Sequence, residues 1–96
     1  MDDNYNYTNI TTQTTTIVSP RGSKLIKIIM NTVAANGVVT IYDNNAASGK
    51  KVGTVTNPAS ITSNGGPVCT EYGVTMQNGI TIVTAGANQD ITVVWK

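Results

Sequence analysis

The sequence predicts an all-β domain, a two-sheet antiparallel β-sandwich that is jelly-roll-like and has seven or eight short strands. Threonine is the commonest residue, valine and isoleucine dominate the apolar set, and Leu25 is the only leucine, which is a strand-forming composition. Short apolar runs are separated by turn residues throughout the chain. No segment has the apolar spacing of three and four residues that an amphipathic helix needs.

The chain of 96 residues has room for one domain with one modest core. Residues 1–10, MDDNYNYTNI, mix asparagine, aspartate and tyrosine without a clear period. We therefore expect residues 1–10 to form an extended N-terminal arm outside the core. Residues 11–96 are expected to form the single β-sandwich domain.

The strands of the first two thirds follow from runs of β-forming residues that end at turns. Residues 11–18 end at a turn with proline and glycine, and residues 24–32 carry apolar side chains on both faces, as a central strand does. Asn36 and Gly37 tolerate positive φ and predict a hairpin to a return strand. The predicted strands are 11–18 at an edge, 24–32 in the centre of a sheet, 38–43, 51–56 and a short edge strand at 60–62.

Three consecutive antiparallel strands are predicted in the last third, at residues 71–76, 79–84 and 90–95. A three-residue loop at residues 77–79, with Gly79 in the left-handed region, preserves the alternation of apolar residues across the first hairpin. The predicted pairs are Met76 with Ile80, Val74 with Ile82, and Tyr72 with Thr84.

Charge and targeting signals argue against several classes of partner. The formal net charge is +1 and charged residues are 11% of the chain, so we expect no nucleic acid and no acidic membrane as partner. The pairs Lys24/Lys27 and Lys50/Lys51 are interpreted as solvated residues that guard strand edges. Met1 precedes a polar run, and no apolar run is long enough to cross a bilayer. A soluble protein made in a cytoplasm is expected.

No catalytic site, metal site or cofactor is predicted, and the chain is not expected to be an enzyme. Histidine is absent and carboxylates are few. An enzyme would require Asp43, Glu71 and Asp90 to converge in a cleft, and their spacing does not suggest it. Asp43 is predicted to cap its own turn and not to bind calcium. The single cysteine, Cys69, lacks a histidine partner and is predicted to be a small buried hydrophobe.

The aromatic residues are the main candidates for binding. Tyr42, Tyr72 and Trp95 alternate with apolar neighbours, so we expect them to pack in the core or at its rim. Tyr5 and Tyr7 lie in the expected arm, where docking on a partner would bury them. The candidate partner-binding residues are Asn4, Tyr5, Asn6 and Tyr7.

Two stretches, about half of the chain, carry a recognisable pattern of alternation and turns. The string GVVTIYDNNAASGKKVGTV at residues 37–55 is similar to a V-x-V-Y-D-N-x-A-A-S-G pattern, and EYGVTMQNGITIVTAGANQDITVVWK forms residues 71–96. In these stretches the chain resembles small proteins from the structural-gene regions of tailed bacteriophages, of the capsid decoration, cement or head-fibre type. The pattern contains no catalytic residue.

The resemblance implies a non-enzymatic virion structural protein that decorates and stabilises the outside of a bacteriophage capsid. It also implies the major capsid protein as partner, a homotrimer between capsomers, a location on the capsid surface and synthesis in the host cytoplasm. The alternative is a carbohydrate- or host-surface-binding β-sandwich module of a phage fibre or tail. In that alternative, loop asparagines and exposed aromatic residues contact the ligand.

Overall fold

The computed structural model describes residues 5–32, 34–56 and 68–96, which contain eight strands and no helix. The strands are β1 (Asn6–Ile10), β2 (Thr15–Ser19), β3 (Ser23–Thr32), β4 (Val38–Asp43), β5 (Lys50–Thr56), β6 (Val68–Met76), β7 (Ile80–Ala85) and β8 (Asp90–Trp95). In this part of the chain no helix is long and apolar enough to span a membrane.

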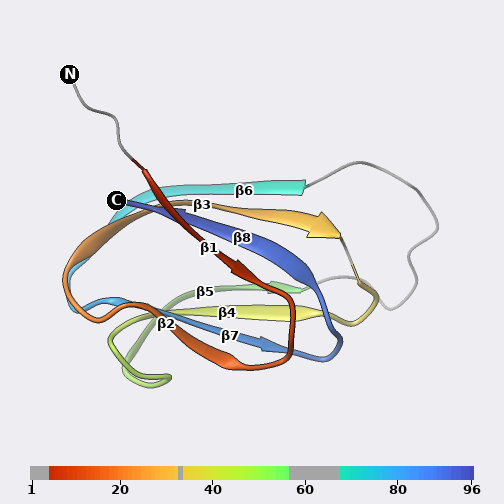
Figure 1. Ribbon diagram of the computed structural model, residues 1–96. Helices are drawn as coiled ribbons and strands as arrows, with labels where there is room; N and C mark the ends of the chain where they lie inside the picture. The colour runs from red at the N-terminus through yellow and green to blue at the C-terminus, as the bar shows by residue number, and fades with distance from the viewer. Residues whose placement is uncertain (1–4, 33, 57–67) are drawn as a thin grey trace.

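The strands form two antiparallel sheets of four that face each other (Figure 1). Sheet A has the order β1-β8-β3-β6, and sheet B has the order β2-β7-β4-β5. Among the described strands, β4 and β5 are the only consecutive pair in one sheet, and every other pair of consecutive strands is divided between the two sheets. This order is that of an eight-stranded jelly roll, and the predicted two-sheet β-sandwich is confirmed.

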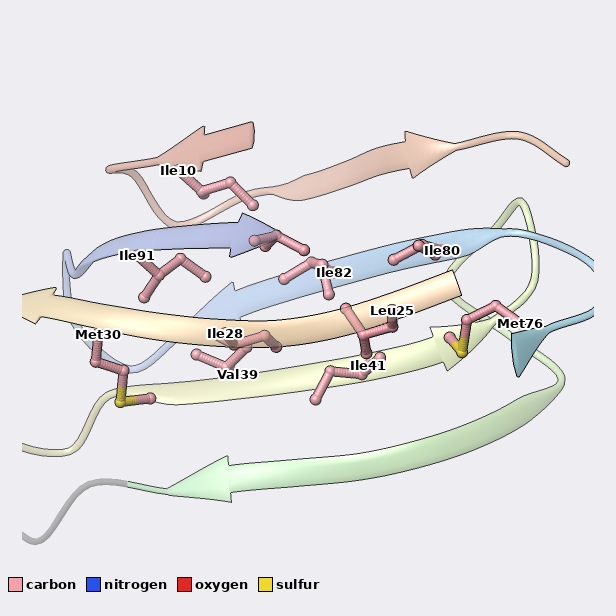
Figure 2. Close-up of a cluster of buried hydrophobic side chains, with 11 residues drawn as sticks. Ile10, Leu25, Ile28, Met30, Val39, Ile41, Met76, Ile80, Ile82 and Ile91 are labelled. Atoms are coloured by element: carbon pink, nitrogen blue, oxygen red, sulfur yellow. The ribbon is translucent and has the colours of Figure 1, made fainter. Parts of the chain in front are cut away.

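The core lies between the sheets (Figure 2) and is built from inward residues of β1, β3, β4, β6, β7 and β8, while partly buried valines of β2 and β5 pack against it. Alternation in β3 points Ile28 and Met30 inward, and Ile41 and Ile82 meet them from sheet B. Burying one such side chain fully contributes about 1.5–3 kcal/mol. The core residues are Ile10, Leu25, Ile28, Met30, Val39, Ile41, Met76, Ile80, Ile82, Ile91 and Val93.

The predicted positions of two strands within their sheets are confirmed. β2 is an edge strand of sheet B, and β3 lies between β8 and β6 in sheet A. Lys50 and Lys51 lie on the edge strand β5 as expected. Lys24 and Lys27 do not guard an edge, because β3 is central. The strand predicted at 60–62 lies outside the described residues.

The pairing predicted between neighbouring strands is wrong at both proposed hairpins. β3 and β4 lie in different sheets, and so do β6 and β7. Met76 pairs with Ser23 and Ile80 pairs with Ser19, so the register that joined Met76 to Ile80 does not form, and the last three strands do not lie side by side. Met76 and Ile80 both reach the core, from opposite sheets. Alternation of apolar residues specifies which face of a strand is inward. It does not specify whether two such strands pair in one sheet or face each other from opposite sheets.

The prediction that residues 1–10 form an arm outside the core is wrong for residues 6–10. β1 pairs with β8 over five residues, and Ile10 is 4% exposed. The Trp95 indole also donates a hydrogen bond to the Thr8 hydroxyl, at 3.4 Å. The segment lacks a helical or strand period of its own, so the edge of β8 supplies the order. The domain therefore includes β1.

Candidate functional site

The outer face of sheet A displays the candidate binding residues of β1. Thr8 and Ile10 face the core side, so the alternate residues Tyr7 and Asn9 face outward. The Tyr7 side chain is 76% exposed on a strand held by five pairs to β8. Because the backbone of β1 is already ordered by β8, a partner that contacts Tyr7 does not have to order the chain there.

Of the other candidate residues, Tyr5 and Asn6 are exposed and Asn4 lies outside the described residues. Tyr5 is 53% exposed, and its ring lies 5.4 Å from the Lys96 ammonium. A cation–π contact of this kind contributes about 0.5–1 kcal/mol at an exposed site. Asn6 alternates with Tyr7, so its side chain leaves the other side of β1.

A hydrogen-bonded polar cluster lies on the same outer face and joins three strands. The Asn9 amide of β1 donates to Asp90 Oδ1 and to the Ile91 carbonyl, both at 2.8 Å. The Asn31 amide of β3 donates to Thr92 Oγ1 at 2.9 Å and to Asp90 Oδ1 at 3.2 Å. We use the name outer patch for Tyr7, Asn9, Asn31, Asp90 and Thr92.

The outer patch offers hydrogen-bond acceptors to a ligand. Asn9 and Asn31 use their amide nitrogens within the cluster, and no hydrogen bond among the described residues uses their amide oxygens. These oxygens accept hydrogen bonds from hydroxyl or amide groups. No local sequence pattern groups Asn9, Asn31, Asp90 and Thr92 as one site, because they come from segments up to 83 positions apart.

The three carboxylates that an enzyme would use are spread over the molecule. Asp90 lies in the outer patch, Glu71 lies on β6, and Asp43 ends β4 in the opposite sheet. Asp43 does not cap its own turn as predicted: its Oδ1 accepts the backbone N–H of Asn78 at 2.8 Å, 35 positions away. Among the described residues, no three His, Cys, Asp or Glu side chains are grouped as metal ligands.

The prediction of a buried Cys69 is wrong, because its side chain is exposed. Cys69 lies on the edge strand β6 and pairs with Ile29 of β3. Ile28 points into the core, so Ile29 and its partner Cys69 lie on the outer face of sheet A.

Tyr72 and Trp95 pack against the core, as predicted. Tyr72 approaches β5, where a Cβ atom at Gly53 would lie 3.1 Å from the tyrosine hydroxyl. Burial raises the pKa of Tyr72 above its ordinary value of 10.0, because the charged form loses hydration. Tyr72 is therefore protonated at neutral pH and acts as a packing residue.

The fold and the outer patch define a class, a small jelly-roll domain with an exposed hydrogen-bonding surface on one sheet. Comparison of the chain with protein-family models, with curated proteins and with solved structures finds no match.

Proposed function

We propose that the chain is a non-enzymatic bacteriophage virion structural protein that decorates and stabilises the capsid exterior, with the major capsid protein as its partner. The observation that supports this proposal best is the 76% exposed Tyr7 on the rigid outer face of sheet A. Exposed tyrosines supply large contact areas with a polar edge, as interface residues do. The resemblance of residues 37–55 and 71–96 to small phage virion proteins supports the same role.

The contact proposed for the capsid is mainly apolar and hydrogen-bonding. Tyr7 and its neighbours Asn9 and Asn31 are uncharged, Asp90 is the one charged residue of the outer patch, and the net charge of the chain is +1. Such a contact depends only weakly on salt. Repetition of the binding site over a capsid strengthens a modest contact through effective concentration.

Replacing Tyr7 with alanine is expected to weaken capsid binding at least about tenfold, as loss of an interface tyrosine does. The measurement is co-sedimentation of the purified protein with capsids of the encoding phage from which the protein has been removed. Ile17→Ala is the matched control, because Ile17 is 53% exposed on sheet B and is expected to leave binding unchanged. The proposal fails when the unaltered protein does not sediment with capsids. If Ile17→Ala weakens capsid binding and Tyr7→Ala does not, the capsid contact lies on sheet B.

A second candidate function is carbohydrate binding, which the outer patch favours. The free amide oxygens of Asn9 and Asn31 and the carboxylate of Asp90 suit sugar hydroxyls, and Tyr7 offers a ring on the same face. In this function the protein would be a module of a phage fibre or tail.

Asp90→Asn is expected to weaken glycan binding at least about tenfold, because hydrogen bonds to a charged group are the stronger ones. The same variant keeps an oxygen that accepts the Asn9 and Asn31 amides, so the capsid contact through Tyr7 should remain, which separates the two functions. A glycan array probed with the purified protein makes the measurement, with Asp43→Asn as the control on the opposite sheet. An array without any signal would exclude this second function for the glycans that it displays.

A further inference from the structure

The four edge strands of the sandwich differ in how they resist pairing with other chains. An unprotected edge invites strand addition, and charged side chains, proline, bulges and a very short strand oppose it. β5 carries Lys50 and Lys51, and β2 has a register shift and is followed by Pro20. β6 carries Glu71 and is interrupted by Gly73, at φ +60. β1, with the sequence NYTNI, is as short as β2, but it has a regular register and no charged residue or proline.

One hydrogen-bonded pair shows whether the N–H and C=O groups of each β8 residue point to β3 or to β1. Lys24 of β3 and Lys96 exchange both of their N–H···O bonds, at 3.0 and 2.8 Å, so the Lys96 backbone faces β3. The N–H and C=O groups of successive residues in a strand point to opposite neighbours. Ile91 is an odd number of positions from Lys96, so its N–H and C=O groups point to β1. The bond from the Asn9 amide to the Ile91 carbonyl agrees with this direction.

The free backbone groups of β1 can then be assigned. Ile10 is the register partner of Ile91, so it faces β8, and alternation applies along β1 as well. The residues whose backbone groups bond to β8 are Asn6, Thr8 and Ile10. Tyr7 and Asn9 therefore direct their N–H and C=O groups away from the sheet, where no described strand pairs with them.

We propose that a second copy of the chain adds its own β1 to this edge, antiparallel, about a two-fold axis at Thr8. In this register Tyr7 of each copy lies opposite Asn9 of the other copy. Both residues then exchange N–H and C=O bonds, so all the outward groups of β1 are paired. The two copies of sheet A become one continuous sheet of eight strands.

The side chains of β1 favour its own copy as the occupant. The strand has no charged residue, so two copies meet without like-charge repulsion. The two Thr8 side chains become cross-strand neighbours, a pairing that stabilises sheets. This inference does not depend on the capsid role. It gives the free protein two-fold symmetry, in contrast to the trimer that the resemblance implies.

Light scattering after size-exclusion chromatography of the full chain tests the pairing. A dimer of about 20 kDa is expected from twice the chain mass of 10.1 kDa. Tyr7→Pro removes the outward N–H and is expected to weaken the dimer at least about tenfold. Tyr7→Ala keeps that N–H and is the matched control, which should remain a dimer. A monomer or a trimer of the unaltered chain, or a folded Tyr7→Pro variant that dimerises normally, would overturn the proposal.

An engineered disulfide between the two β1 strands tests the proposed register, independently of the proline variant. At the two-fold axis the two Thr8 Cα atoms would lie about 4.5 Å apart, as in a non-hydrogen-bonded antiparallel pair, which is within disulfide range. In a Cys69→Ser background, Thr8→Cys is therefore expected to form a covalent dimer on oxidation, seen on a non-reducing gel. Asn6→Cys should not, because its opposite residue is Ile10. Equal crosslinking of both variants, or of neither, would refute the register.

Discussion

Replacing Gly86 with alanine is expected to destabilise the protein by about 3 kcal/mol or more, since backbone strain and a steric clash add. Gly86 has φ +81 in the turn between β7 and β8. A Cβ atom there would overlap the backbone carbonyl of Asn36, in the turn between β3 and β4. Asn36 also has positive φ, at 64°, so neither turn relaxes easily.

Gly73→Ala is the matched control for Gly86→Ala. Gly73 also has positive φ, at +60, but a Cβ atom there would meet nothing within 4 Å. Its replacement should cost only about 1–2 kcal/mol, the strain of the left-handed region. Urea unfolding of the three proteins measures the difference. Equal stability losses for the two variants would mean that the turn at Gly86 does not contact the turn at Asn36 as described.

Ile82→Ala is expected to cost about 3 kcal/mol, within the range for a buried isoleucine cut to alanine. The side chain is 0% exposed, and β7 lies between β2 and β4 in the middle of sheet B. Truncation loses the burial of the removed methyl groups and leaves a cavity that the flanking strands cannot close. The melting temperature should fall by more than about 10 °C for a chain of this size.

Ile17→Ala makes the same chemical change on the neighbouring strand β2, at a side chain that is 53% exposed. Surface substitutions of this kind change stability by about 0.5 kcal/mol or less. Thermal unfolding followed by circular dichroism compares the two variants. A similar loss from Ile17→Ala would show that the outer face of sheet B is covered by something that the described residues do not include.

Most strand positions could be predicted from local pattern. The predictions 38–43 and 90–95 coincide with β4 and β8, and 24–32 differs from β3 by one residue. Each of these segments is a run of apolar and β-branched residues bounded by turn residues, so its composition and boundaries alone identify it. β1 could not be predicted in this way, because Asn6–Ile10 gains its order from β8.

Part of the candidate site could also be predicted from local pattern, and part could not. The exposure of Tyr5 and Tyr7 could be predicted, because their segment has no apolar periodicity. The contribution of Asn31 and Asp90 could not, since a polar residue on the outer side of a strand resembles any other until its neighbours are known. Only pairing across β1, β8 and β3 brings the amide nitrogens of Asn9 and Asn31 to 2.8 and 3.2 Å from Asp90 Oδ1.

The sequence by itself determined the fold class and most strands, because these depend on composition and on short apolar runs between turns. It did not determine the inward face of β3, where a register shift between Leu25 and Lys27 buries Leu25 with Ile28 in place of Ile26. The tertiary structure alone decided which strands pair, that β1 belongs to sheet A, and that Asn9, Asn31 and Asp90 share a surface. Strand pairing in a jelly roll joins segments distant along the chain, and its free energy is set by contacts across the core that no local pattern encodes.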